Sequence, residues 1–399
     1  MTLVLETQAV KGAGLDLLKS VDWAFVKSDT SYSTHDFHPY PAKFIPQIPQ
    51  TLIEALSKTG DTVLDPFCGS GTALVESLLL GRNAIGVDLN PLAVLITKAK
   101  TTPLSSQQIV RITKFLDALK QDFSNVYKAS TDKTCPRYDP PAPLPLIPKL
   151  DFWFDSIAIR EAAVMKRRID EMSDEVLRNF LAVAFSSILV SISRQDSDTR
   201  YVRRQKNLRP LDAFRRFQAR VHHMAERIAE FSKIPNLPKA LVYHRDSRDL
   251  SFLKPASVHL VVTSPPYPNA YSYHLYHQYR MLWLGMDPWA FKKDEIGSHR
   301  KYSKKANGAT ADTFAAEMQQ CFDGLHRVLV ERGRFCLVIG DSILRGQLID
   351  NSQLLRRVAE VSGFQFEAEF ERPIDLRRKS FNPKIGKIRH EHILVFKRV

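Results

Sequence analysis

The feature that most constrains the fold of this chain is a stretch in which a glycine-rich turn joins two short apolar runs and a helical pattern. Residues 60–90 read GDTVLDPFCGSGTALVESLLLGRNAIGVDLN. TVLD predicts a buried strand, ALVESLLL predicts a helix that ends at Gly81, and NAIGVD predicts a second strand. A strand, a glycine loop, a helix and a second strand in this order are typical of a parallel α/β sheet.

Further strands are expected after residue 240. The segments 240–249 and 258–264 predict two strands, and residues 311–330 and 334–341 predict a helix and a strand. The last two predicted strands, 364–374 and 389–398, are joined by a basic loop. We therefore expect a Rossmann-like α/β fold: a mostly parallel seven-stranded sheet with an antiparallel C-terminal hairpin.

Residues 101–240 differ from the rest of the chain. A proline-rich segment at 135–149 predicts an extended connector, and long helical patterns follow at 176–192 and 209–233. We therefore expect two parts, an α/β domain built from residues 1–100 and 241–399 and a helical insertion at 101–240.

The charge of the chain indicates a polyanionic partner. It has 57 Lys and Arg residues against 43 Asp and Glu residues, a net charge of +14, and nucleic acid is the leading candidate. Its four cysteines form no C-x-x-C pair, so we expect neither a structural zinc site nor a disulfide framework, and no metal. The sequence shows no secretory pattern and no long uncharged apolar run, which predicts a cytoplasmic protein without a membrane span.

Carboxylates follow three of the predicted strands. The glycine loop, DPFCGSGT (65–72), is not a Walker A motif, because no lysine follows its last glycine. Asp65 is placed to hold an ammonium group, Asp88 lies about 20 residues downstream, where a ribose diol is bound, and Asp246 is placed to accept from an adenine amino group. A cofactor with an amino acid, a ribose and an adenine but no phosphates matches these acids, and we expect S-adenosylmethionine.

A second unusual feature is the loop after the strand VHLVV, which reads Thr263, Ser264, Pro265, Pro266, Tyr267. Proline fixes φ and has no N–H to donate, so two prolines cannot continue a central strand. They predict a stiff, extended loop whose carbonyl oxygens have few internal partners, followed at once by an aromatic ring. Such a loop is suited to hold a flat group that donates hydrogen bonds.

With these motifs together, the chain resembles the amino-group DNA methyltransferases, which have the class I S-adenosylmethionine-dependent fold and a [DNS]-P-P-[YFW] signature. DPFCGSGT is similar to their cofactor loop and GVDLNP to their ribose-binding segment. HRDSRDL (244–250) is similar to the segment that reads the adenine, and HPYPAKFIP (38–46) to the segment that closes over the methionine end. The serine form TSPPY is most often seen in the cytosine-N4 branch.

The resemblance implies a set of site residues. The expected catalytic residues are Ser264, Pro265, Pro266 and Tyr267. The expected cofactor-binding residues are Tyr40, Lys43, Phe44, Asp65, Pro66, Phe67, Cys68, Gly69, Ser70, Gly71, Thr72, Asp88, Asn90, Asp246, Ser247 and Thr263.

The resemblance also implies how the loop 264–267 acts. The lone pair of an exocyclic amino nitrogen is delocalised into the ring, and oxygens that accept its N–H hydrogens favour the transition state. Ser264 and the Pro265 carbonyl supply these acceptors, Pro266 stiffens the loop, and Tyr267 stacks on a base flipped out of the duplex. Ring-carbon methylation needs a cysteine nucleophile, usually after a proline, and no cysteine here follows a proline.

Double-stranded DNA is the expected partner. The residues expected to bind it are Arg194, Arg200, Arg203, Arg204, Lys206, Lys304, Lys305, Arg377 and Arg378. The insertion 101–240 is a candidate target-recognition region, but it precedes the adenine segment rather than the loop 264–267, so structural packing and dimerisation stay open. A partner restriction endonuclease is expected from the resemblance only.

Other functions stay open. The serine before the prolines favours cytosine-N4 over adenine-N6 methylation and leaves both open. Enzymes that methylate RNA or tRNA bases share the glycine loop, but those acting on guanine N2 usually have an acid where this chain has Ser264. A catalytically silent DNA-binding protein on the same fold is the third alternative, and intact loops at both sites argue against it.

Overall fold

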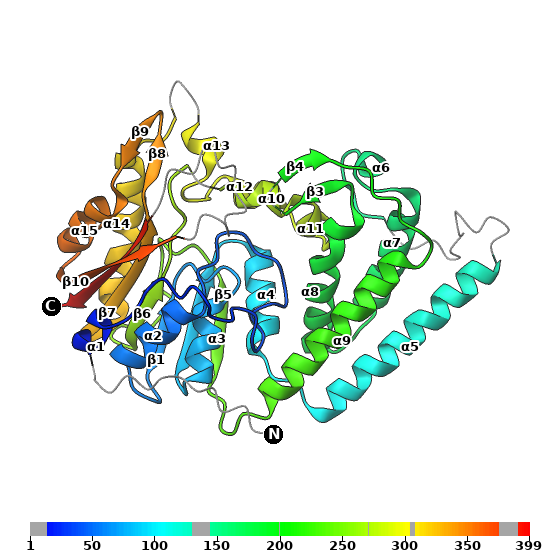
Figure 1. The fold of residues 1–399 in the computed structure, drawn as a ribbon, viewed down its shortest axis with the longest axis horizontal. Coiled ribbons are helices and arrows are strands. Elements are labelled where there is room, and N and C mark those ends of the chain that lie inside the picture. Colours follow the sequence, from blue (N-terminus) through cyan, green and yellow to red (C-terminus); the bar gives the residue numbers. More distant parts are fainter. Residues whose placement is uncertain (1–13, 130–143, 199, 270, 304–307, 375–389) are drawn as a thin grey trace.

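The computed structural model describes residues 14–129, 144–198, 200–269, 271–303, 308–374 and 390–399. Seven strands form one sheet in the order β10-β11-β7-β6-β1-β2-β5 (Figure 1). Their bounds are β1 Thr62–Asp65, β2 Asn83–Asp88, β5 Ala240–His244, β6 Val258–Thr263, β7 Leu329–Gly340, β10 Phe364–Pro373 and β11 His390–Arg398.

The sheet is mostly parallel, as predicted. β1 pairs in parallel with β2 and β6, β2 with β5, and β6 with β7, whereas β11 runs antiparallel between β7 and β10. The predicted class I, Rossmann-like fold with its antiparallel C-terminal pair is therefore confirmed. Because parallel strands end at the same edge, the segments after β1, β2, β5 and β6 meet at one edge of the sheet.

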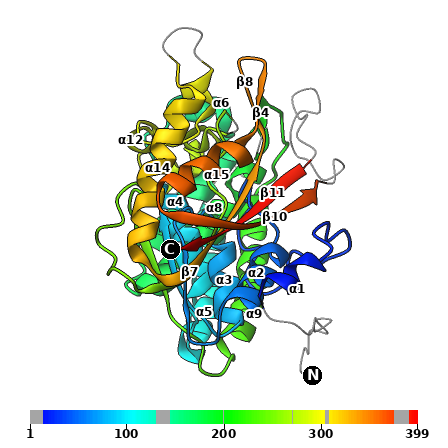
Figure 2. The same ribbon diagram turned by 90° about the vertical axis from the view of Figure 1, so that its left-hand side faces the viewer.

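Helices cover both faces of the sheet. They are α1 Leu15–Lys19, α2 Gln47–Leu56, α3 Thr72–Leu79, α4 Pro91–Thr101, α14 Ala311–Val328 and α15 Asn351–Val361. Successive residues of a strand point to opposite faces, so Val63 packs with α1 and α2 whereas Leu64 packs with α14 and α15. Figure 2 shows these two helix pairs on opposite sides of the sheet.

Short elements lie along the edge where the parallel strands end. The helices α10 Tyr273–Tyr276, α11 Gln278–Trp283, α12 Pro288–Lys292 and α13 His299–Tyr302 follow β6. The hairpin of β8 Ser342–Leu344 and β9 Gln347–Ile349 follows β7. The helices α12 and α13 and the hairpin β8–β9 were not predicted from the sequence.

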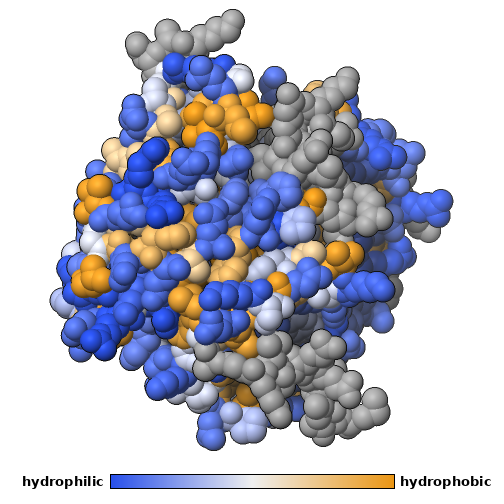
Figure 3. Space-filling model, turned by 60° about the vertical axis from the view of Figure 1, so that its left-hand side comes forward, coloured by the Kyte–Doolittle hydropathy of each residue, from blue (hydrophilic) through white to orange (hydrophobic). Residues whose placement is uncertain are grey.

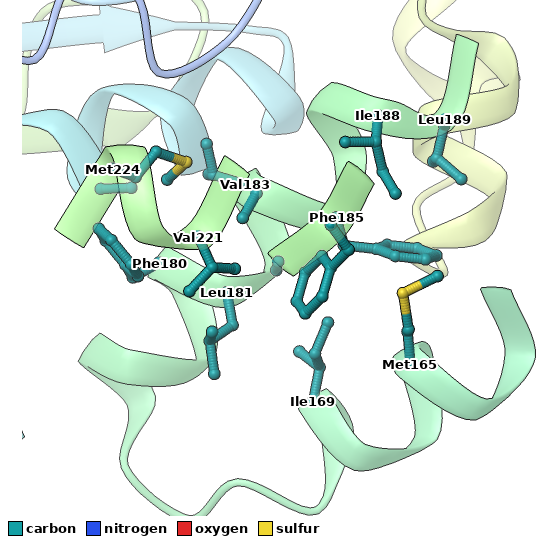
Figure 4. Close-up of a cluster of buried hydrophobic side chains, with 14 of the residues drawn as sticks. Met165, Ile169, Phe180, Leu181, Val183, Phe185, Ile188, Leu189, Val221 and Met224 are labelled. Atoms are coloured by element: carbon teal, nitrogen blue, oxygen red, sulfur yellow. The ribbon is translucent and has the colours of Figure 1, made fainter. Parts of the chain in front are cut away.

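Between β2 and β5 the chain forms a helical unit. Its elements are α5 Ser106–Ala129, α6 Leu150–Trp153, α7 Ser156–Asp170, α8 Glu175–Ile192, β3 Gln195–Ser197, β4 Arg200–Arg203 and α9 Asp212–Ser232. Figure 4 shows Met165 of α7, Phe185 of α8 and Val221 of α9 in one apolar cluster. Leu92 of α4 belongs to the same cluster, so the insertion and the α/β domain share a hydrophobic core. Arg280 of α11 also donates to the Ser186 carbonyl of α8 over 3.1 Å.

One described helix, α8, is long and apolar enough to cross a membrane by length and composition alone. Within the protein, 72% of that stretch is buried, which is the pattern of a core helix. Figure 3 shows one face of the molecule, where apolar residues form small patches among polar ones.

Candidate active site

Residues far apart in the sequence line one cleft of about 790 Å³, its open mouth included. Of the expected site residues, those lining it are Tyr40, Lys43, Phe44, Phe67, Cys68, Gly69, Ser70, Thr72, Asp88, Asn90, Asp246, Ser247, Ser264 and Pro266. Those that do not line it are Asp65, Pro66, Gly71, Thr263, Pro265 and Tyr267. Lining residues that the sequence did not single out are Ala42, Leu89, Tyr273, Asp294, Glu295 and Ile296.

The glycine loop turns tightly and is bound by the acid at the end of β2. Gly69 has φ +48° and Gly71, which precedes α3, has φ +77°, a region that glycine adopts without strain. The Asp88 carboxylate accepts from the backbone N–H groups of Gly69 and Asn90, each over 2.8 Å. Burial raises the pKa of Asp88 to about 6. The carboxylate is thus held in place by fixed backbone groups beside the cleft.

Asp65, at the end of β1, lies directly behind the lining. One carboxylate oxygen accepts from Thr263 Oγ1 (2.6 Å) and from the Phe67 N–H (3.1 Å), which ties β1 to β6. The other oxygen is buried and has no partner among the described residues. Burial raises the pKa of Asp65 to about 7. Above about pH 7 this carboxylate is therefore a buried negative charge that no described cation neutralises.

Asp246 follows β5 and is paired with Arg248. The Nε of Arg248 lies 3.0 Å from each carboxylate oxygen of Asp246, and its Nη2 also donates to that carboxylate. Arg248 reaches further, to Glu317 of α14 (3.3 Å) and to the Asp294 carbonyl (3.1 Å). The acid expected to contact the adenine is thus oriented by an arginine that also holds the 294–296 wall of the cleft.

The segment before α2 covers the glycine loop. The Tyr40 ring lies close to Gly69, and it stacks on the Tyr273 ring with centroids 5.8 Å apart. The segment is anchored by buried polar groups, because His35 Nε2 and Glu76 Oε1 lie 2.6 Å apart. Burial raises the pKa of Glu76 to about 8.

The diproline loop begins where β6 ends. Ser264 and Pro266 line the cleft, but the Tyr267 hydroxyl donates to Glu391 of β11 over 3.1 Å, and its ring packs against the cluster beneath the loop. Burial raises the pKa of Tyr267 well above its usual value. Tyr273 of α10, which the sequence did not single out, lines the cleft together with Tyr40, Phe44 and Phe67.

The wall opposite the glycine loop comes from residues 294–297. Glu295 accepts from the Tyr273 N–H over 2.5 Å, and its other oxygen lies 2.6 Å from His274 Nδ1. The Gly297 carbonyl accepts from the Asn269 N–H over 3.0 Å. No motif marks this wall in the sequence, because its role depends on a fold that brings it against the diproline loop.

Gly297 is expected to be essential for the shape of that loop. A Cβ at this position, with φ +73°, would lie 2.8 Å from the Tyr267 carbonyl oxygen and 3.0 Å from that of Pro266. Gly297→Ala should destabilise the protein by about 1–3 kcal/mol more than Gly285→Ala does. Gly285 is the matched control, since its φ is +74° and no atom lies within 4 Å of its added Cβ. Equal melting temperatures for the two variants would contradict the close contact.

Several residues expected to bind DNA are used within the protein. Lys206 donates to the carbonyls of Val190 (2.7 Å) and Gln195 (2.6 Å), and Arg194 donates to the Asp151 carbonyl (2.6 Å). Arg203 lies over the Phe152 ring at 4.6 Å, and Arg204, with 73% of its side chain exposed, lies 3.6 Å from Asp196. The Arg200 side chain, Lys304, Lys305, Arg377 and Arg378 lie outside the described residues.

Within the described residues, no group of three or more His, Cys, Asp or Glu side chains could hold a metal ion. Cys68, Cys321 and Cys336 are buried and unpaired with one another. Cys135 lies outside the described residues.

Comparison with known proteins gives three kinds of match. A family model described as DNA methylase matches residues 9–99. Type II methyltransferase M.MvaI of Kocuria varians is 29% identical over 66% of this chain and 60% of its own length. Type II methyltransferase M.MjaII of Methanocaldococcus jannaschii is 23% identical over 91% of this chain and 80% of its own length. A solved SAM-dependent methyltransferase from Methanosarcina mazei matches 91% of this chain and 99% of its own at 10% identity and a TM-score of 0.34.

Proposed function

We propose that this chain transfers a methyl group from S-adenosylmethionine to the N4 amino group of a flipped cytosine in duplex DNA. The family model and the relatives described above support its relation to the amino-group DNA methyltransferases. The observation that carries the proposal is the meeting of two loops. β1 and β6 are neighbours in the sheet, so Gly69 and Ser264, which follow them, line the same cleft. If the two loops lay at opposite edges of the sheet, a methyl group could not pass from a cofactor bound at one loop to a base bound at the other.

The lining of the cleft fits a cationic cofactor without phosphates. Lys43 is the one lysine or arginine among its lining residues, against four acids: Asp88, Asp246, Asp294 and Glu295. Phosphates favour cationic partners, so this balance argues against a dinucleotide. Ser70 Oγ is buried without a partner among the described residues and is available to a ligand.

We assign parts of the cofactor to these residues on that basis. Asp88 would hold the ribose hydroxyls, and Asp246 with Ser247 the adenine. Tyr40, Lys43 and Ser70 would hold the methionine end, with Asp65 behind them. When bound, S-adenosylmethionine supplies an electrophilic methyl group on a positively charged sulfur.

The diproline loop would hold the amino group that receives the methyl. Ser264, which lines the cleft, and the carbonyl of Pro265, the next residue of the loop, would accept its N–H hydrogens and so direct the nitrogen lone pair toward the donor. The prolines keep these acceptors in fixed positions because their φ angles cannot rotate freely. The amino group loses one proton to water, so no strong general base is required.

The choice of cytosine N4 over adenine N6 depends on the serine before the prolines, and adenine-N6 methylation is the second candidate. Expression in a host without DNA methylation, followed by sequencing that reports modified bases, tests the proposal. We expect N4-methylcytosine within one recurrent motif, which a partner restriction endonuclease, if present, would share. N6-methyladenine would overturn the base assignment. Unmodified DNA from cells that contain the folded protein would overturn DNA as the substrate.

Exposed arginines of the hairpin β3–β4 are expected to contact phosphates. The affinity for DNA falls as salt rises, and each phosphate contact adds about 0.9 to the steepness of log affinity against log salt. The double variant Arg203→Ala and Arg204→Ala should therefore make this slope shallower by about 1–2. Lys58→Ala is the control, because Lys58 is exposed before β1 at the opposite edge of the sheet. Titration of labelled duplex DNA at four salt concentrations gives the slope, and an unchanged slope would remove this hairpin from the interface.

A further inference from the structure

The cleft contains buried negative charge that the protein around it does not neutralise. Asp88 is bound by two backbone N–H groups, and Glu295 by one backbone N–H group and a histidine. Among the described residues, neither carboxylate forms an ion pair with a lysine or an arginine. The chain as a whole has a net charge of +14, whereas the side chains that line this cleft are mainly acidic.

The histidine partner of Glu295 has one ring nitrogen without a hydrogen-bond partner among the described residues. The side chains of Glu295 and His274 are both 3% exposed. His274 Nδ1 faces the carboxylate, and His274 Nε2 is buried with no partner in the described part of the chain. A protonated ring would leave a second N–H without an acceptor, which is costly in a buried position. The neutral ring, with its hydrogen on Nδ1, satisfies the carboxylate and adds no positive charge.

The other charged groups at the cleft do not cancel this charge. Lys43 is one cation against four lining acids, and it donates to the His35 carbonyl over 3.1 Å rather than to Asp88 or Glu295. Arg248 is engaged by Asp246 and Glu317. The Asp294 side chain is 59% exposed, so water screens its charge. Asp88 and Glu295 both line the cleft. Burial raises the pKa of Asp88, and the nearby Glu295 carboxylate adds to that rise.

We propose that Glu295 makes the cleft select the positively charged methyl donor over the neutral thioether left after transfer, an inference that rests on the proposed function. During transfer, the bond between sulfur and the methyl carbon breaks and its electron pair stays on sulfur. The amino nitrogen bonds to the methyl carbon and releases a proton to water. The cofactor thus loses one positive charge while Glu295 stays ionised, so the attraction decreases and the product leaves more readily.

Calorimetric titration with three ligands tests this inference without any turnover. S-adenosylmethionine and sinefungin both carry a positive charge at the transfer position, and S-adenosylhomocysteine does not. In Glu295→Gln, affinity for the two cationic ligands should decrease about tenfold, the effect of one charge several ångströms away in a partly screened site. Affinity for S-adenosylhomocysteine should change by less than about threefold. Glutamine keeps the hydrogen bond from the Tyr273 N–H through its oxygen, and its amide can donate to His274 Nδ1 once the ring hydrogen moves to Nε2. The melting temperature of the variant is therefore measured alongside, to show that it is folded.

Asp312→Asn is the matched control, because it removes an exposed acid of α14 that does not line the cleft and should leave the ratio of the affinities unchanged. An equal loss for all three ligands in Glu295→Gln would mean that Glu295 only shapes the wall, and this would overturn the inference. Unchanged affinities would overturn it as well. If the native protein binds none of the ligands, the proposed function itself fails, a result distinct from the other two.

Discussion

Ser264→Ala is expected to reduce methyl transfer to duplex DNA by about a hundredfold while the affinity for S-adenosylmethionine stays within about threefold. Ser264 follows β6 and lines the cleft beside Pro266, where it can accept from the amino group of the target base. That hydrogen bond has its effect as the nitrogen lone pair localises, so its loss raises the barrier more than it weakens binding. Single-turnover transfer of a labelled methyl group, with calorimetry on the same preparation, separates the two quantities.

Ser257→Ala is the matched control for this variant. Ser257 precedes the same strand at its other end, and its hydroxyl donates to the Lys254 carbonyl over 2.7 Å, away from the cleft. It should transfer methyl groups at the native rate. Full activity of Ser264→Ala would leave only the backbone carbonyls of the loop as acceptors, and the catalytic role of the serine hydroxyl would be rejected.

Asp65→Asn is expected to stabilise the free protein at pH 8 and to weaken cofactor binding. The asparagine oxygen can still accept from Thr263 and Phe67, and the substitution removes a buried charge that has no cation partner among the described residues. The pKa of Asp65 is raised to about 7 from 3.8, so its cost to stability is complete above pH 7 and decreases as the pH falls from 7 toward about 4. The gain should be on the order of 2–4 kcal/mol at pH 8.

The pH dependence of that gain identifies its cause. Below pH 7 the folded protein increasingly holds Asp65 protonated, so the difference in melting temperature should decrease gradually and vanish near about pH 4, where the unfolded chain also binds the proton. Asp117→Asn, at an exposed position of α5, should show no such pH-dependent gain. If Asp65 holds the ammonium group of the cofactor, the affinity of Asp65→Asn for S-adenosylmethionine should be about tenfold lower than that of the native protein. Unchanged affinity would limit Asp65 to tying β1 to β6.

The two motifs of the cleft could be predicted from the sequence because each is a local arrangement. DPFCGSGT and TSPPY each follow a short apolar run, and each owes its conformation to glycines or prolines within it. Because the strands are parallel, their carboxyl ends lie at one edge of the sheet, and the meeting of the two motifs follows from strand order alone. Asp88 and Asp246 reach the cleft for the same reason, since each follows a parallel strand.

The opposite wall could not be predicted in this way. Tyr273 and Glu295 carry no distinctive local pattern, and they meet because α10 and the segment after α12 fold back against the diproline loop. Arg248 illustrates the same limit, since its three acidic partners lie in different parts of the chain. The basic segment 193–209 suggested DNA contacts by composition, yet Lys206 is used at the end of α8.

By itself, the sequence determined the sheet, the glycine turn, the diproline loop and the balance of charge, since these depend on neighbouring residues and on strand order. Only the tertiary structure decided which acids are neutralised and which remain charged at the cleft. The physical reason is that a carboxylate's effect depends on the burial and the partners that distant segments bring to it. Asp246 has its arginine from two residues away, whereas Glu295 has only a neutral histidine and a backbone N–H group.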